Sequence, residues 1–197
     1  MYTVNQLYLN RMEKVLIRVL SEKKRVSAFR IDLRFPIENS DYHNDTKVIT
    51  RFIESLKEKI KWDVKNKSKL WRKALTEKLD YIWVREVGSE SHHAHYHVIL
   101  FLNKDNYYSL GDYKKNDGNL AALINQAWNS ALNIKSEKAS GLVHFSGKYH
   151  LVQYQSNNCN NTNLQFELDK LRQAFHYLAK DYTKAYHSGF RSIGCSQ

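Results

Sequence analysis

Two runs of strand-forming residues that lie close together in the chain place the strongest constraint on its fold. Residues 81–87 read YIWVREV and residues 95–103 read HYHVILFLN, with a short connection rich in Gly, Ser and His between them. Runs of this kind joined by a short polar segment are typical of a β-hairpin. The longest apolar run, at 98–102, has the length of a strand and is far short of the ~18 apolar residues that cross a membrane. We therefore expect an antiparallel sheet and no membrane span.

Helices and further strands are predicted on both sides of this hairpin. Apolar residues at helical spacing predict helices over about residues 2–20, 46–62, 67–78, 119–132 and 164–186. The segment SAFRIDLRFP alternates apolar and charged residues until Pro36 and predicts a half-buried strand. GLVHFS and KYHLVQY predict a second hairpin that turns at 146–148. Because helices and strands do not alternate regularly, we expect an α+β fold with a central antiparallel sheet flanked by helices.

The composition favours one domain and an anionic partner. The chain carries 31 Lys and Arg against 20 Asp and Glu, a net charge of +11, and only one Pro and seven Gly. We therefore expect a single domain over residues 1–197 without a flexible linker. The basic balance favours nucleic acid as the partner, ahead of an anionic membrane surface. The two cysteines form neither a disulfide framework nor a metal motif, and no signal sequence is visible, so we expect a cytoplasmic protein.

Two histidines at the start of the second hairpin strand are the first candidates for chemistry. Side chains alternate along a strand, so His95 and His97 project from one face and Tyr96 from the other. If the hairpin register pairs Glu86 with His95, the Glu86 carboxylate lies on the same face. Two imidazoles and a carboxylate can bind one divalent metal and leave positions open for a substrate oxygen. The alternative is a His-x-His sequence at a solvated strand end.

The last predicted helix carries a tyrosine on its polar face. Apolar residues from 164 to 186 follow steps of three and four and form a stripe that continues through Tyr182. Tyr177 lies outside this stripe, on a basic face with Lys170, Lys180 and Lys184. Neighbouring ammonium groups favour the phenolate form of a tyrosine, which makes Tyr177 a candidate nucleophile. The alternative is an exposed aromatic residue on a solvated helix face.

Other basic and aromatic residues are candidates for binding DNA. Lys170 and Lys184 lie on the helix of Tyr177, and His93 lies just ahead of the histidine strand, where it contacts either DNA or solvent. The basic segment 57–78 fits either a groove that follows DNA phosphates or an ordinary solvated helix face. The aromatic residues available for stacking on bases are Tyr107, Tyr108 and Tyr113.

These motifs together resemble those of known protein families. A His-hydrophobic-His strand followed about eighty residues later by YLAK on a helix is similar to the HUH endonucleases, which nick single-stranded DNA through a tyrosine. More closely, the chain resembles the YagK/YfjJ-type domain family, which is related to replication proteins of filamentous phages and their satellites. The segments that carry this resemblance are FRIDLRFP, ITRFIESLK, YIWVREVG, HYHVILFLN, GLVHF, YLAKDYTK and RSIGCS.

The resemblance implies an HUH or RRM-like palm with the catalytic tyrosine on the C-terminal helix. The residues it assigns are metal ligands at His95 and His97, a third ligand at Glu86, a nucleophile at Tyr177 and a helper cation at Lys180. It also implies Mn²⁺ or Mg²⁺ as the ion, of which imidazole ligands favour Mn²⁺. Relatives with two tyrosines carry the second one four residues after the first. That position is Asp181 here, so a mechanism with one tyrosine is expected.

The activity implied by the resemblance is nicking and joining of single-stranded DNA through a 5′-phosphotyrosyl intermediate. This reaction would initiate rolling-circle replication of a phage or mobile element in the cytoplasm of a bacterial host. The implied partners are single-stranded DNA at a replication origin and a host helicase and polymerase, with no membrane. The alternatives are a nickase of the transposase or relaxase type and a DNA-binding regulator without catalysis. The presence of His95, His97 and Tyr177 argues against the regulator.

Overall fold

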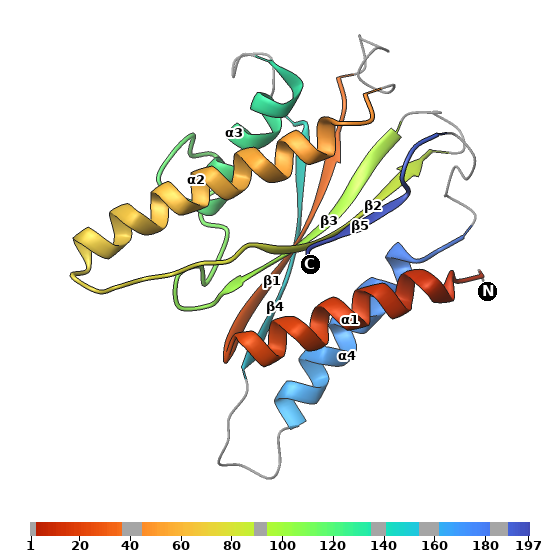
Figure 1. Ribbon diagram of the computed structural model, residues 1–197, viewed down its shortest axis with the longest axis horizontal. Helices are drawn as coiled ribbons and strands as arrows, with labels where there is room; N and C mark the ends of the chain where they lie inside the picture. The colour runs from red at the N-terminus through yellow and green to blue at the C-terminus, as the bar shows by residue number, and fades with distance from the viewer. Residues whose placement is uncertain (1–2, 37–44, 89–93, 135–140, 154–161, 182–188) are drawn as a thin grey trace.

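The fold is an α+β arrangement built on one antiparallel sheet. The computed structural model describes residues 3–36, 45–88, 94–134, 141–153, 162–181 and 189–197. Its elements in chain order are α1 (Gln6–Glu22), β1 (Arg25–Arg34), α2 (Val48–Leu70), β2 (Asp80–Val87), β3 (Ala94–Asn103), α3 (Leu120–Leu132), β4 (Val143–Gln153), α4 (Thr162–Leu178) and β5 (Ile193–Cys195). The five strands pair antiparallel in the order β4-β1-β3-β2-β5 (Figure 1). The expected α+β fold with a central antiparallel sheet flanked by helices is therefore confirmed.

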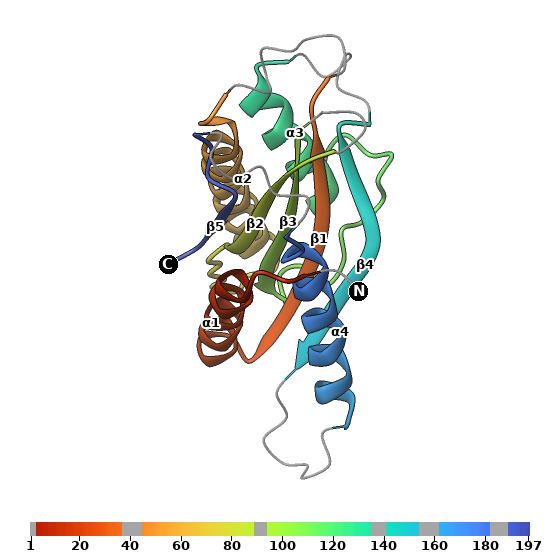
Figure 2. The same ribbon diagram turned by 90° about the vertical axis from the view of Figure 1, so that its right-hand side faces the viewer.

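Helices cover both faces of the sheet and bury a separate core on each (Figure 2). β1 shows how one strand serves both cores, because its successive side chains point to opposite faces. Phe29, Ile31 and Leu33 pack with α2 and α3, whereas Val26 and Ala28 pack with α1 and α4. The charged side of the SAFRIDLRFP segment therefore faces the α1 and α4 layer, where Arg30 is half-buried, Asp32 is buried and Arg34 is exposed.

The two terminal helices differ from their predicted lengths. α1 begins at Gln6 instead of at about residue 2, and α4 ends at Leu178 instead of reaching residue 186. Lys180 has left the helix and forms an isolated antiparallel bridge with Val4. The chain after α4 is thus held by the segment that precedes α1. Residues 182–188, which include Tyr182 and Lys184, lie outside the described part of the structure.

Two other local predictions are wrong, and the first is overturned by strand pairing. The segments GLVHFS and KYHLVQY form one strand, β4, whose two halves both pair with β1. The register shift between Phe29 and Ile31 accommodates extra residues of β4 at 146–148, so residues that predict a turn form a bulge. The short helix predicted at 67–78 does not form either. α2 continues to Leu70, and residues 71–79 contain no further helix.

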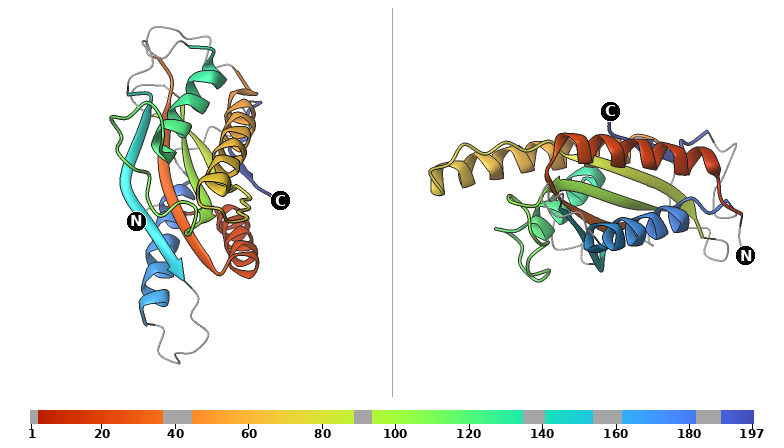
Figure 3. Two further views of the ribbon diagram at one scale, coloured as in Figure 1. Left: turned by 90° about the vertical axis from the view of Figure 1, so that its left-hand side faces the viewer. Right: turned by 90° about the horizontal axis from the view of Figure 1, so that it is seen from below.

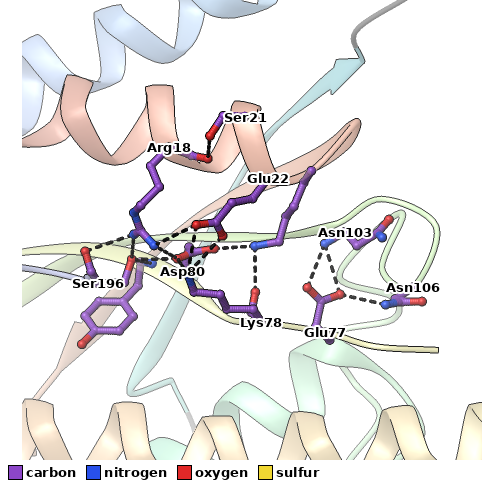
Figure 4. A network of polar contacts seen from close by, with 11 residues as sticks. Arg18, Ser21, Glu22, Glu77, Lys78, Asp80, Asn103, Asn106 and Ser196 are labelled. Atoms are coloured by element: carbon purple, nitrogen blue, oxygen red, sulfur yellow. Dashed lines mark hydrogen bonds and ion pairs between the residues drawn. The ribbon is translucent and has the colours of Figure 1, made fainter.

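A polar network ties α1 to the beginning of β2 and to the end of the chain (Figure 4). The Asp80 side chain is fully buried, and its carboxylate contacts Lys23 and lies 3.0 Å from Nη1 of Arg18. The Ser196 hydroxyl donates a hydrogen bond to Asp80 at 3.1 Å and accepts one from Arg18 at 2.8 Å. Burial by itself would raise the pKa of Asp80, but these partners hold the pKa below its usual value. The network therefore anchors β5 beside β2.

Candidate metal and tyrosine site

The hairpin places its histidines and glutamate as the sequence predicts. β2 and β3 pair Glu86 with His95 and Val84 with His97, so the Glu86 carboxylate lies on the face of the two imidazoles. β3 also pairs with β1, which brings Asp32 directly opposite His97 from the other side. This face of the sheet is the one covered by α1 and α4.

The ligand atoms of the three side chains converge on one point. His95 Nε2 lies 3.2 Å from His97 Nε2, and Oε2 of Glu86 lies 3.3 Å from His97 Nε2 and 3.8 Å from His95 Nε2. A point equidistant from these three atoms lies about 2.0 Å from each, which is the length of a bond from nitrogen or oxygen to a small divalent ion. In the described part of the chain, this is the group of His, Cys, Asp and Glu side chains that could hold a metal ion.

Burial of the three residues leaves the group open on one side. Glu86 and His97 are each 5% exposed, whereas the His95 side chain is 28% exposed. A site closed by four protein ligands is typical of structural metals, and an open position is typical of catalytic ones. Three converging ligand atoms with access to solvent therefore fit the second kind.

Asp32, on β1, contacts His97 on the side away from the other two ligands. It was not among the site residues predicted from the sequence. Its Oδ1 lies 2.5 Å from Nδ1 of His97, which leaves Nε2 directed at Glu86 and His95. Burial would lower the pKa of His97, but the Asp32 and Glu86 carboxylates raise it above its ordinary value. For Asp32, burial is outweighed by the hydrogen bond to His97, and its pKa is lowered. The two carboxylates thus make this a site that favours positive charge.

Tyr177 lies beside this group, at the last turn of α4. The centroid of its ring is 6.0 Å from that of His97, and the residue is 38% exposed. Nζ of Lys180 lies 3.4 Å from the centroid of the tyrosine ring. Lys180 contacts Tyr177 as predicted, but it is 9% exposed and lies after the end of the helix, so the two residues do not share one polar helix face. The bridge to Val4, and not helical spacing, brings Lys180 to the tyrosine.

A second cation, Arg30, contacts the tyrosine from β1, and the sequence analysis missed it as well. Its guanidinium carbon lies 4.7 Å from the centroid of the Tyr177 ring, and its Nε lies 3.7 Å from Asp32. That Nε atom is buried, and among the described residues it has no hydrogen-bond partner. The alternation of the first strand places Arg30 and Asp32 on one face, which was the available signal. Their approach to His97 depends on the pairing of β1 with β3.

The other predicted DNA contacts lie away from the site or outside the described residues. His93 and Lys184 lie outside the residues that the structure describes. Lys170 is two turns of helix before Tyr177, about 10 Å along the axis, and Nζ lies 3.8 Å from Glu167 and 4.0 Å from the centroid of the Phe166 ring. The structure therefore does not bring Lys170 into the group around Tyr177.

The predicted stacking residues and basic segment are also distributed differently. Tyr107 is buried and its hydroxyl donates a hydrogen bond to Asp63 at 2.6 Å, so its predicted role in stacking on bases is wrong. Tyr108 and Tyr113 are exposed, and Tyr113 stacks on Phe145. The basic segment 57–78 begins in α2, which packs on the opposite face of the sheet from the histidines. None of the helices in the described ranges is long and apolar enough to cross a membrane.

Comparison with known proteins gives a family and two relatives. Residues 2–196 match the YagK/YfjJ C-terminal domain family. The chain is 35% identical to the uncharacterized protein YfjJ of Escherichia coli strain K12, with 97% of this chain and 94% of that protein covered. It is 36% identical to the uncharacterized protein YagK of the same strain, with 96% and 92% covered. No solved structure matches the chain.

Proposed function

The chain belongs to the YagK/YfjJ C-terminal domain family, and we propose that it is a metal-dependent endonuclease of the HUH type that nicks and rejoins single-stranded DNA through Tyr177. One observation carries this proposal. An exposed tyrosine stands beside three converging metal-ligand side chains, although His97 and Tyr177 are eighty residues apart in the sequence. A site for a cation next to a nucleophile suits attack on a phosphodiester.

The residues that would hold the metal are Glu86, His95 and His97, with Asp32 fixing the imidazole of His97. The donor set of two nitrogens and one oxygen is compatible with Mn²⁺ or Mg²⁺, and the imidazoles favour Mn²⁺. When bound, such an ion polarises the scissile phosphate and offsets the charge that develops on its oxygens. The open side next to His95 leaves room for a phosphate oxygen.

Tyr177 would act as the nucleophile. Its phenol oxygen forms a bond to phosphorus as the bond from phosphorus to O3′ breaks, the phenol proton passes to solvent, and the released O3′ takes up a proton. The product is a 5′-phosphotyrosyl link and a free 3′ hydroxyl, which can prime a polymerase. Attack by a 3′ hydroxyl on the same link reverses the reaction and rejoins the strand. Lys180 and Arg30, which both contact the tyrosine ring, would attract the phosphate to this position.

This chemistry fits the initiation of rolling-circle replication of a phage or mobile element. The partner is then single-stranded DNA at a replication origin, and a host helicase and polymerase supply unwinding and synthesis. A transposase or relaxase uses the same chemistry for another purpose, and the site is compatible with either.

The test is to incubate the protein with circular single-stranded DNA and Mn²⁺ and to separate the products on a denaturing gel. We expect a covalent protein–DNA adduct with the unchanged protein and none with Tyr177→Phe or His97→Ala. Tyr108→Phe is the matched control, because Tyr108 is exposed and lies outside the site. Binding of DNA without an adduct would instead indicate a regulator, and an adduct that survives in Tyr177→Phe would refute the assignment of the nucleophile.

A further inference from the structure

The C-terminal half of α2 exposes large aromatic and apolar side chains to solvent. Trp62 is 66% exposed, Leu70 is 79% exposed and Trp71, which caps the helix, is 48% exposed. This end of α2 projects beyond the sheet and beyond the other helices, as Figure 3 shows in its right-hand view. The remaining two tryptophans, Trp83 and Trp128, are buried in the core. Half of the tryptophans therefore lie on one projecting helix.

The same stretch is the most basic part of the chain. Residues 57–78 contain nine Lys and Arg and three Asp and Glu, so a large share of the net charge of +11 lies here. Trp62, Lys65 and Lys69 follow steps of three and four and lie on one side of the helix. Lys65 and Lys69 are exposed on that side. This side of the helix thus presents the Trp62 indole beside two exposed ammonium groups.

This surface is on the other side of the sheet from Tyr177. The apolar side of α2, which includes Phe52, Leu56 and Ile60, packs on the core that contains Trp83 and Tyr96. The histidines and Tyr177 face the α1 and α4 layer. A nucleotide bound at Tyr177 therefore cannot also touch Trp62, and any ligand of the α2 surface makes a separate contact.

Charge and composition identify the kind of ligand. Lysine is depleted in the centre of protein interfaces, which argues against a protein partner here. A helix that lies on a membrane buries its apolar side in the lipid, but the apolar side of α2 is already packed on the sheet. Aromatic rings interleaved with lysines are instead the arrangement with which proteins stack on bases and follow the backbone of single-stranded nucleic acid.

We propose that Trp62, Trp71 and the lysines around them form a second surface for single-stranded DNA, which holds the strand away from the nucleotide that is cut. The proposal takes DNA as the partner from the proposed function, but it does not require that the protein cuts DNA. Trp62 and Trp71 are nine residues apart, which is about 14 Å along the helix axis and half a turn around it, so a strand that stacks on both rings crosses the end of the helix.

Intrinsic tryptophan fluorescence tests the proposal directly, because the two exposed tryptophans are the ones that DNA would quench. We expect oligothymidylate strands to quench the emission of the full-length protein in EDTA, where no cutting interferes. Trp62→Ala and Trp71→Ala should each weaken binding about tenfold, the effect of losing one stacked base. Lys65→Gln with Lys69→Gln should lower the slope of log affinity against log salt by about 0.7 for each lost phosphate contact.

Matched variants distinguish the effect of this surface from a general effect of charge and from an effect on the cutting site. Lys114→Gln with Lys115→Gln removes the same charge from another exposed position and should leave the affinity and the slope nearly unchanged. The tryptophan variants should keep the thermal unfolding midpoint and should cut short strands at the rate of the unchanged protein, with a raised KM for long strands only.

Three results would overturn the inference. They are an emission that DNA does not quench, tryptophan variants that bind long strands as tightly as the unchanged protein, and a shift of the emission with phosphatidylserine vesicles but not with DNA. Loss of quenching in the variants with no covalent adduct in any protein would support the surface and reject the nuclease. A covalent adduct that forms normally, together with α2 variants that bind DNA like the unchanged protein, would support the nuclease and reject the surface.

Discussion

Replacing Asp32 should weaken metal binding although Asp32 does not itself point at the metal position. Its carboxylate accepts a hydrogen bond from Nδ1 of His97 at 2.5 Å, and this contact keeps Nε2 directed at Glu86 and His95. Both partners are largely buried, with side chains that are 13% and 6% exposed. Loss of the carboxylate would free the imidazole to rotate or to place its proton on the atom that binds the ion.

The expected loss of metal affinity follows from the kind of hydrogen bond that the substitution removes. A hydrogen bond to a charged group contributes about 1.5–3 kcal/mol, and each 1.4 kcal/mol is a factor of ten in affinity. Asp32→Asn keeps the shape and an acceptor oxygen but removes the charge, so we expect the weaker effect, about tenfold. Asp32→Ala also leaves the buried Nδ1 without its partner, so we expect the larger effect, about a hundredfold. This range agrees with the usual cost of removing a group that orients a metal ligand.

The measurement is a titration of each variant with Mn²⁺, in which electron paramagnetic resonance reports the free ion. Asp105→Asn is the matched control, because Asp105 pairs with Arg25 at the far end of β1. Thermal unfolding of each protein without metal shows whether the fold is kept. Equal Mn²⁺ affinities for the unchanged protein and a folded Asp32→Ala would refute the role of Asp32. An unchanged protein that binds no Mn²⁺ would refute the site.

Four further changes test the site and the fold. Tyr177→Phe should change the free energy of unfolding by no more than about 1 kcal/mol, because it removes one hydroxyl from a residue that is 38% exposed, yet mass spectrometry should find no nucleotide-linked peptide. Lys180→Ala should slow adduct formation in a time course without abolishing it, since the lysine stabilises charge and forms no bond to phosphorus. Asp80→Asn should lower the free energy of unfolding in urea by about 3 kcal/mol at neutral pH, because it leaves the buried ammonium of Lys23 without its carboxylate partner. The pKa of Asp80 is lowered in the folded protein, so its contribution to the free energy of unfolding is present above the ordinary carboxyl pKa of about 3.9. This contribution should disappear as the pH falls through the pKa of the folded protein. A stability difference between Asp80→Asn and the unchanged protein that stays constant down to acid pH would contradict this. Gly194→Ala should destabilise by about 1–3 kcal/mol in the same assay, because a Cβ there would overlap the Trp83 indole.

Residues close together in the chain account for the central hairpin and for the face shared by His95 and His97. The period of two along YIWVREV and HYHVILFLN decides which side chains share a face, and a short connection allows few registers. The alignment of Glu86 with His95, on which the predicted site depends, is the one that the structure shows. The helix predicted over 119–132 also has a local origin, because Asn119 caps it and its apolar residues are buried at helical spacing. These features depend on residues close together in the chain.

The residues that surround that face depend on pairing between segments far apart in the chain. Asp32 and Arg30 reach the site because β1 pairs with β3, a pairing of segments about seventy residues apart that no local pattern encodes. The same dependence explains the local errors, since residues 146–148 form a bulge because both halves of β4 pair with β1. α4 ends at Leu178 because the following residues pair with the N-terminal segment, and that pairing carries Lys180 to the tyrosine. Local periodicity fixes which side a residue faces, but the partner on that side is chosen by burial and hydrogen bonding across the whole chain.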